Sequence, residues 1–426
     1  MLTGYRLVLY LVLPWVLFRL AFRGSRNPGY RKRIPERFGF QGPKPPAGGV
    51  WIHAVSVGEV NAAVPLVRRL LVRWPEQAVI VTTMTVTGSD RVRTVLGDQV
   101  RHCYLPYDYP GAVRRFLRHC RPAIGLVMET EIWPNLIAAC RRADIPLIYA
   151  NVRMSERSWK GYRKYRPLVA DTLSGISRFA VQSEPDAERL KDLGARSDRI
   201  RVTGSMKFDV KLSVSVSEAG EAIRRRLGWN RPVFLAASTH DGEEDILISS
   251  FRKLAARIPG LLLILVPRHP ERFSAVDRLC HREGLATVLA TRQSGELDET
   301  VRVLLVDRMG ELTKHIAACD VVFMGGSLVP VGGHNLLEAA ALERPVVFGP
   351  HMFNFAEISS MFLAHGAGIQ VDNEEELVEV VHRLFEDAGM RDEYGLQGRR
   401  LVEQNRGALE QVESMVANEL DQGTVG

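Results

Sequence analysis

Three polar segments in the first half of the sequence follow apolar stretches and carry residue types that could do chemistry. They are Ser56-Val-Gly-Glu59, Glu129-Thr-Glu131 and Thr203-Gly-Ser-Met-Lys207. The Glu59 carboxylate could act as a general base, but Ser-x-x-Glu is also the spacing of a helix-capping box. Pro65 would lie inside a helix that starts at Ser56, which disfavours the capping interpretation. Spacing alone therefore leaves both roles of Glu59 open.

The other two segments also allow two interpretations each. Glu129 and Glu131 are two residues apart, and on a strand they would face opposite sides, so we expect only one of them in a site. Lys207 is either a solvated lysine or a cation that balances an anionic donor.

The second half carries a more specific set of polar segments. Arg268-His269 follows an apolar stretch, and arginine binds phosphate or carboxylate with two hydrogen bonds. Asp307-Arg-Met309-Gly310-Glu311 follows the next one. Gly325-Gly326-Ser327 and Gly332-Gly333-His334-Asn335-Leu336-Leu337-Glu338 then lead into an alanine-rich helix. Glycines allow backbone N–H groups to approach a phosphate, and a carboxylate one turn later can bind a ribose. Asn335 and Glu338 also fit a capping pattern, but the segments together predict a nucleotide site.

Missing motifs narrow the chemistry. The chain has no Gly-x-Gly-x-x-Gly after a strand and no Walker motif, which disfavours dinucleotide oxidoreductases and excludes P-loop hydrolases. It also has no Asp-x-Asp, the motif with which many glycosyltransferases hold a metal on a nucleotide-sugar diphosphate. A donor with one phosphate, neutralised by Lys and Arg without a metal cofactor, fits this absence.

The elements that must position these residues alternate between strand and helix. Continuous apolar runs, typical of strands buried on both faces of a parallel sheet, are predicted at 49–54, 78–83, 123–128, 146–150 and 178–182, and at 232–237, 261–266, 302–306, 321–324 and 345–348. The expected fold is α/β, with two Rossmann-like doubly wound domains that face a cleft. The expected domains are 39–208 and 232–400, joined by a linker at 209–231 and followed by a C-terminal helix at 401–426.

The N-terminal segment 1–38 predicts a membrane anchor with a basic flank. Residues 7–18 carry no charge, and 2–22 could cross a bilayer if Arg6 and Arg19 extend toward its surfaces. Eight of the 56 basic residues and one of the 49 acidic residues lie in the first 40 positions, which contain the whole net charge of +7. This placement favours an anionic membrane surface with the body on the cytoplasmic side, and it disfavours nucleic acid as a partner.

Two further features bear on partners and compartment. Residues 153–166 hold six basic side chains and three aromatic ones, which form either a solvated helix face or a site for a phosphate-bearing acceptor. The five cysteines are scattered and contain no Cys-x-x-Cys pair, which indicates a reducing compartment and argues against a structural zinc site.

The sequence resembles the 3-deoxy-D-manno-octulosonic acid (Kdo) transferases of lipopolysaccharide assembly. The resemblance rests on motifs that occur in order from the anchor to about residue 360: WIHAVSVGE, YLPYDYP, METEIWPN, ANVRMSERS, VTGSMKFD, AASTHDGEE, LVPRHPERF and GGHNLLEAAALERPVVFGP. It implies a GT-B fold and an inverting glycosyltransferase on the cytoplasmic face of the inner membrane. The implied donor is CMP-Kdo, the implied acceptor is the tetraacylated lipid A precursor, and no metal is expected.

The resemblance also implies roles for individual residues. Glu59 matches the general base, and Glu129 and Lys207 match positions that stabilise the transition state. The positions that match the CMP-binding segments are Arg268, His269, Met309, Gly310, Glu311, Asn335, Leu336, Leu337 and Glu338. Two alternatives remain, another GT-B enzyme that transfers or epimerises a UDP-sugar and a non-catalytic nucleotide-binding module in which Glu59 is only a cap.

Overall fold

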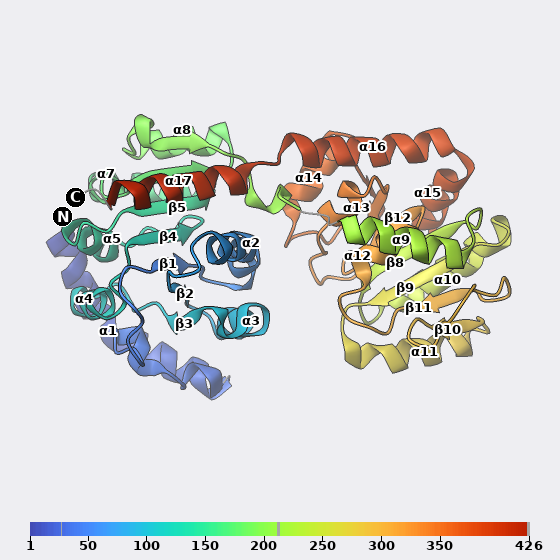
Figure 1. Cartoon of the computed structure of the whole chain (residues 1–426), viewed down its shortest axis with the longest axis horizontal. Helices are drawn as coiled ribbons and strands as arrows, with labels where there is room; N and C mark the ends of the chain where they lie inside the picture. The colour runs from blue at the N-terminus through green and yellow to red at the C-terminus, as the bar shows by residue number, and fades with distance from the viewer. Residues whose placement is uncertain (27, 211–213, 424–426) are drawn as a thin grey trace. The chain divides into compact units, whose positions relative to one another are not determined.

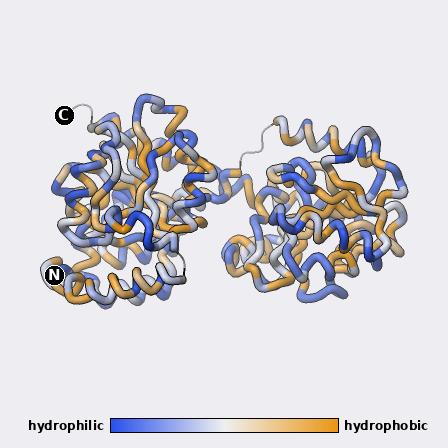
Figure 2. The backbone as a smooth tube through the Cα atoms, turned by 90° about the horizontal axis from the view of Figure 1, so that it is seen from below, coloured by the Kyte–Doolittle hydropathy of each residue, from blue (hydrophilic) through white to orange (hydrophobic). Residues whose placement is uncertain are grey.

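The computed structural model describes residues 1–26, 28–210 and 214–423, which form two compact α/β units (Figure 1). Unit 1 contains Met1–Asp209 and Arg406–Gly426, and unit 2 contains Val210–Asn405. Each unit has a seven-stranded parallel sheet with helices on its faces, and hydrophobic residues concentrate in the interior of each (Figure 2). The expected fold class of two doubly wound domains is thus confirmed.

The sheet of unit 1 has the order β3-β2-β1-β4-β5-β6-β7. Its strands are β1 (Val50–His53), β2 (Val79–Thr83), β3 (Arg101–Tyr104), β4 (Ile124–Met128), β5 (Leu147–Val152), β6 (Arg178–Val181) and β7 (Ile200–Val202). Its α-helices are α1 (Leu2–Arg26), α2 (Val57–Arg73), α3 (Val86–Leu96), α4 (Pro110–Cys120), α5 (Pro134–Arg142), α6 (Glu156–Arg163), α7 (Arg166–Leu173), α8 (Glu184–Asp192) and α17 (Ala408–Gly423). Short 3₁₀ helices are η1 (Pro28–Tyr30), η2 (Ile34–Phe38), η3 (Gly97–Gln99), η4 (Ser197–Arg199) and η5 (Met206–Phe208).

The sheet of unit 2 has the order β10-β11-β9-β8-β12-β13-β14. Its strands are β8 (Val233–Thr239), β9 (Leu262–Pro267), β10 (Thr287–Leu289), β11 (Val303–Leu305), β12 (Val321–Met324), β13 (Val346–Phe348) and β14 (Ile369–Gln370). Its helices are α9 (Val214–Leu227), α10 (Glu243–Arg257), η6 (Pro270–Arg272), α11 (Phe273–Arg282), α12 (Leu312–Ala318), α13 (Leu337–Ala341), α14 (Ala356–Ala364), α15 (Glu374–Glu386) and α16 (Ala388–Gln404).

Apolar side chains on both faces of each sheet form the cores. In unit 1, α2, α3 and α17 cover one face of the sheet, while α4, α5, α7 and α8 cover the other. The central strands are continuous runs of buried residues because both faces are covered. In unit 2, α10, α11 and α15 pack on one face over Phe234, Leu263 and Phe323.

Two segments between and after the sheets differ from their expected roles. The range expected as a linker contains α9, which packs on α12 where Gly220 meets Ala317, and which buries Ile223 and Leu227. Residues 211–213 of that range lie outside the described residues. The range 401–426, expected to be one helix, is divided between the end of α16 in unit 2 and α17, whose apolar side joins the core of unit 1.

Helix α1 is exposed along most of its length but is attached to unit 1 near its start. By length and composition it is the one helix in the described part of the chain that could cross a membrane, over Leu2–Ser25. The Tyr5 hydroxyl donates to Asp108 at 3.0 Å, the Arg6 Nε donates to Asn135 at 2.7 Å, and the Tyr109 hydroxyl donates to the carbonyl of Leu9 at 3.1 Å. Its first turns therefore lie on the body.

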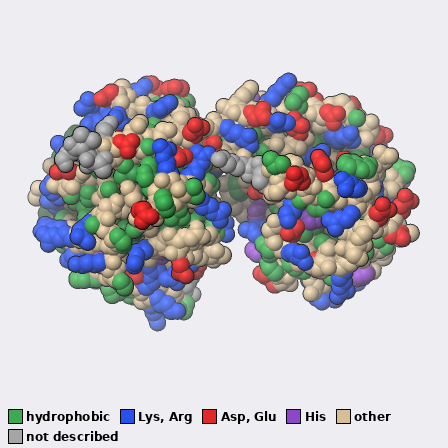
Figure 3. Space-filling view, in the orientation of Figure 1, with side chains coloured by type: hydrophobic (Ala, Val, Ile, Leu, Met, Phe, Trp, Pro, Cys, Tyr) green, Lys and Arg blue, Asp and Glu red, His purple; other side chains and the backbone are tan. Residues whose placement is uncertain are grey.

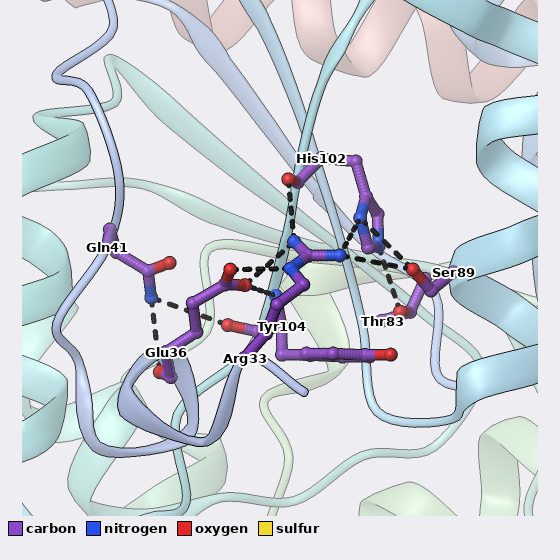
Figure 4. Close-up of polar contacts among 7 residues, drawn as sticks. All are labelled: Arg33, Glu36, Gln41, Thr83, Ser89, His102 and Tyr104. Atoms are coloured by element: carbon purple, nitrogen blue, oxygen red, sulfur yellow. Dashed lines mark hydrogen bonds and ion pairs between the residues drawn. The ribbon is translucent and has the colours of Figure 1, made fainter. Parts of the chain in front are cut away.

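Two arginines of the basic flank behind α1, Arg33 and Arg37, are folded onto the edge strand β3, whereas Arg23, Arg31 and Lys32 are exposed. Arg33 forms two hydrogen bonds with Glu36, at 2.5 and 2.8 Å, and also contacts Ser89 and His102 (Figure 4). Glu36 accepts the backbone N–H of Tyr104 at 2.9 Å. Arg37 is buried and lies with its guanidinium 4.1 Å from the Tyr104 ring centroid. Arg33 and Arg37 therefore hold the fold together, so the expected lipid role of the flank is wrong for these two.

We expect Glu36→Gln to destabilise unit 1 by about 2 kcal/mol, because it leaves the half-buried Arg33 guanidinium without a counter-charge. Denaturant unfolding measures the loss, and hydrogen exchange should show faster opening of β3. Glu188→Gln is the matched control, since it breaks the Lys191–Glu188 pair at the surface, where ion pairs contribute little to stability. Equal losses in the two variants would contradict a supporting role for the Arg33–Glu36 pair.

Candidate functional site

The strand order of unit 1 reverses between β1 and β4, and this switch point is where open α/β sheets bind ligands. The loop after β1 leads to Glu59, in the first turn of α2, and the loop after β4 begins with Glu129. The two predicted carboxylates therefore follow neighbouring strands at the same edge of the sheet.

Glu59 is nearly buried, with 8% of its surface exposed, and both of its carboxylate oxygens are engaged. The backbone N–H of Val55 donates to one oxygen at 2.7 Å, and the Ser56 hydroxyl donates to the other at 3.2 Å. Ser56 stands at the N-cap of α2 but makes no capping hydrogen bond. Glu59 thus ties down the loop before the helix without forming the reciprocal capping box.

The argument from Pro65 against a helix is wrong. Helix α2 runs from Val57 to Arg73 with Pro65 inside it. Its apolar side is buried against the sheet through Val60, Leu66 and Val67, and this packing outweighs one lost backbone hydrogen bond.

Burial raises the pKa of Glu59 to about 8, and the nearby charges of Glu129 and Glu131 raise it as well, while the Val55 N–H lowers it. A carboxyl group with a pKa close to neutral pH is suited to take a proton from a hydroxyl group.

The charges of Glu129 and Glu131 both contribute to the raised pKa of Glu59, and the expectation that only one of the two side chains faces the site stays a prediction. Glu129 has a left-handed backbone with φ of +59°, which ends the alternation of the strand just after β4. Burial raises the pKa of Glu131 to about 7, with a contribution from Glu129. Glu131, which the sequence set beside Glu129 without assigning it a role, belongs to this group of carboxylates.

Lys207 lies in η5, on a turn that Asn151 positions at the end of β5. Asn151 is fully buried with φ of +57°, and its Oδ1 accepts the backbone N–H of Met206 at 3.0 Å. The Lys207 ammonium is half-exposed and has no ion-pair partner among the residues that the structure describes. It is thus a cation available to a ligand.

Segment 153–166, which the sequence left open as a solvated helix face or an acceptor site, is partly engaged with its own unit. Lys160 pairs with Glu156, and both Arg163 and the Trp159 indole contact Asp192. The Arg166 Nε donates to the backbone carbonyl of Asp192. These contacts show that several of its basic side chains stabilise the surface of unit 1.

In unit 2 the strand order reverses between β8 and β12. The predicted donor residues occupy loops at the same edge: Arg268 and His269 follow β9, Met309 to Glu311 follow β11, and Asn335 to Glu338 follow β12. The Thr313 hydroxyl donates to Glu338 at 2.8 Å, which joins the last two segments, and Glu311 pairs with Lys314 at 3.1 Å.

The predicted residues differ in what they can offer a ligand. Arg268, His269 and Met309 are exposed. Leu336 and Leu337 are fully buried, so only their backbone is available, and Asn335 Oδ1 already accepts the N–H of Leu337 at 3.2 Å.

The glycine-rich segment 325–328 does not offer its N–H groups to a phosphate, contrary to expectation. The fully buried Glu243 accepts the N–H groups of Gly326, Ser327 and Leu328 at 2.7, 3.1 and 3.0 Å. This carboxylate instead holds the loop after β12 against the start of α10.

A histidine cluster joins the loops after β8, β9 and β12, and two of its members, His240 and His334, were not among the predicted site residues. The Nε2 atoms of His240 and His334 lie 2.8 Å apart, and the rings of His240 and His269 are 5.4 Å apart. Burial lowers the pKa of His334 to about 4, helped by His240. The space-filling view shows histidines on the surface of unit 2 (Figure 3). Their positions after β8 and inside Gly-Gly-His-Asn were the available signal.

Within the described residues, no group of three His, Cys, Asp or Glu side chains is arranged to hold a metal ion.

Comparisons with known proteins agree on one family. Residues 32–210 match the family model for 3-deoxy-D-manno-octulosonic-acid transferase (kdotransferase). The chain is 39% identical over 412 residues to the 3-deoxy-D-manno-octulosonic acid transferase of Haemophilus influenzae, covering 96% of each chain.

Solved structures are similar to parts or most of the chain. The C-terminal CMP-Kdo binding domain of WaaA from Acinetobacter baumannii is 30% identical, over 45% of this chain and 99% of that one, with a TM-score of 0.42. UDP-GlcNAc 2-epimerase from Neisseria meningitidis is 14% identical, over 88% of this chain and 100% of that one, with a TM-score of 0.54, which reflects the fold alone. From its sequence identity over nearly the full length of a curated relative, the chain belongs to the 3-deoxy-D-manno-octulosonic acid transferase family of glycosyltransferases.

Proposed function

We propose that this Kdo transferase transfers Kdo from CMP-Kdo to a hydroxyl group of the tetraacylated lipid A precursor, with inversion at the anomeric carbon and without a bound metal. Unit 1 activates the acceptor and unit 2 binds the donor. The observation that carries the proposal is Glu59, a buried carboxyl group with a pKa of about 8 at the switch point of unit 1.

The proposed reaction is a single displacement. The acceptor hydroxyl gives its proton to the Glu59 carboxylate while its oxygen forms a bond to the anomeric carbon of Kdo. The bond from that carbon to the CMP phosphate breaks, and CMP leaves with the electron pair. Glu129, whose side chain has no hydrogen-bond partner among the described residues, follows the strand next to the one that leads to Glu59 and would stabilise positive charge on the sugar.

The charge of the leaving phosphate must be balanced without a metal in this proposal. Lys207 and Arg268 are the predicted residues with free positive charge, one in each unit. In unit 2 the histidine cluster and Glu311, Asn335 and Glu338 border the same strand ends and would bind the cytidine and its ribose.

We further infer that the enzyme works at the cytoplasmic face of the inner membrane. Support comes from α1, whose apolar residues are mostly exposed, and from the lipid nature of the proposed acceptor. The proposed site of Kdo transfer is then next to the layer in which the acceptor resides.

The test is a product assay. The purified chain is incubated with CMP-Kdo and the tetraacylated lipid A precursor, and the lipid products are weighed by mass spectrometry. We expect mass increases in whole Kdo units, release of CMP, and no loss of activity with a chelator. Transfer from a UDP-sugar in place of CMP-Kdo, or loss of activity that added metal restores, would contradict the proposal.

A further inference from the structure

Unit 1 contains a cavity of about 610 Å³ with a strongly basic lining. Five arginines line it: Arg6 from α1, Arg114 and Arg118 from α4, Arg121 just after α4, and Arg142 at the end of α5. The other lining residues are Pro110, Leu117, Pro122, Ala139, Ala143 and Ile145, so the lining has no carboxylate.

These arginines also lack counter-charges nearby. Arg6 donates to the neutral amide oxygen of Asn135, and the other four have no ion pair with any described residue. Elsewhere in the same unit, Arg69 and Arg73 share Glu413. The C-terminal ends of α4 and α5 favour basic residues because the helix dipole is negative there. This effect explains part of the preference for arginine at positions 118, 121 and 142. It does not account for Arg6 or Arg114, which lie away from those ends.

The clustered guanidinium groups of the cavity favour an anionic ligand. Several guanidinium groups around one space repel each other, and an anion between them removes that cost. Guanidinium groups bind phosphate with paired, charge-assisted hydrogen bonds.

The position of the cavity separates it from the reacting carboxylates. Much of the lining lies at the C-terminal ends of α4 and α5, which in a βα unit point to the amino edge of the sheet. Glu59 lies at the carboxyl edge. A phosphate held by Arg118, Arg121 and Arg142 therefore lies toward the opposite edge of the sheet from Glu59, whereas Arg6 and Pro110 extend the lining toward the carboxyl edge.

Helix α1 borders the cavity, and its exposed side chains indicate the environment of the cavity. Its exposed side chains include Leu7, Leu11, Trp15 and Phe18, which are between 56% and 72% exposed. An apolar helix next to a basic cavity is suited to the boundary between lipid tails and headgroups.

We propose that the arginine cavity binds the headgroup phosphate of an anionic membrane phospholipid. The cavity is complete only while Arg6 stays on the body, where Tyr5–Asp108 and Tyr109–Leu9 hold the first turns of α1. Lipid binding in the cavity therefore stabilises α1 along the membrane surface.

The experiment is a vesicle-binding assay on the full chain without donor or acceptor, so its failure is separate from a failure of the proposed function. Binding is compared between phosphatidylcholine vesicles and vesicles that also contain phosphatidylglycerol. The pocket variant is Arg118→Gln with Arg142→Gln. The control variant, Arg68→Gln with Arg93→Gln, removes two exposed arginines from α2 and α3 on the opposite face of the sheet. Thermal unfolding confirms that both variants fold.

We expect the preference for phosphatidylglycerol to fall about 25-fold in the pocket variant, at about fivefold per basic residue, with little change in the control. Binding to phosphatidylcholine should persist in both, because α1 supplies it. An equal fall in the two variants would show a general charge effect and overturn the proposal. So would an unchanged preference in the pocket variant. Tight binding of inorganic phosphate that the pocket variant loses while its vesicle preference remains would assign the cavity to a soluble anion.

Discussion

Glu59→Gln is expected to reduce Kdo transfer by about 10²–10⁴-fold, because the amide cannot accept the proton of the acceptor hydroxyl. The variant should fold, since the Gln carbonyl oxygen can still accept the N–H of Val55. Its affinity for CMP should be unchanged, because Glu59 belongs to unit 1. Initial rates of transfer and CMP binding by calorimetry measure both effects, and transfer at the wild-type rate would contradict the role of Glu59 as base.

The pH dependence gives an independent readout of the same group. With a pKa of about 8, Glu59 must lose its proton to work, so kcat/KM of the wild type should rise with pH and level off above about 8. A profile that is flat between pH 6 and 8 would not be compatible with this base.

The same raised pKa makes Glu59 costly for stability. Because the pKa of Glu59 is higher in the folded state than in the unfolded state, the folded state is favoured while Glu59 is protonated. This contribution to stability is complete below about pH 4.5 and is lost as the pH rises toward 8. Glu59→Gln removes this loss, so its stability relative to the wild type should improve by about 3 kcal/mol between pH 6 and pH 9. Denaturant unfolding at the two pH values measures it, with Glu76→Gln, an exposed glutamate, as control.

Lys207→Met should reduce kcat by about 10²-fold with a smaller change in the KM for the donor. Its ammonium is proposed to stabilise negative charge that grows on the leaving phosphate, and such charge is greatest in the transition state. Lys207→Arg should restore part of the rate because it keeps the charge at a similar reach.

Lys44→Met, which removes an exposed lysine elsewhere in unit 1, is the control and should leave the rate unchanged. An increase in the donor KM of Lys207→Met with kcat intact would assign Lys207 to ground-state binding. Equal rates for Lys207→Met and the wild type would remove it from the mechanism.

The strands that the sequence predicted are the ten inside the two sheets, and the strands it missed are the four at the sheet edges. The edge strands are β3, β7, β10 and β14. Their residues are partly exposed, as in β3, where only Tyr104 is buried. A strand with one open side needs no continuous apolar run, so it has no signal of the kind that identified β1 or β9.

The parts of the site that depend on residue type could be predicted from the sequence. The parts that depend on backbone geometry could not. The polar segments after β1, β4 and β9 could be located because ligands bind at strand ends. The left-handed backbone of Glu129, which ends the strand alternation after β4, is not visible in any periodicity of the sequence. The binding of Glu243 to the glycine loop could not be predicted either, because Glu243 and Gly326 are 83 residues apart in the sequence.

The return of α17 to unit 1 bears on the order in which the protein is made. Ala408, Leu409, Val412 and Val416 complete the core on one face of the first sheet. The ribosome must therefore synthesise all of unit 2 before unit 1 can close, roughly 200 residues after Asp209, or about 10–40 s at ~5–20 residues per second. Helix α1 thus belongs to a unit that stays open while the whole of unit 2 is being synthesised.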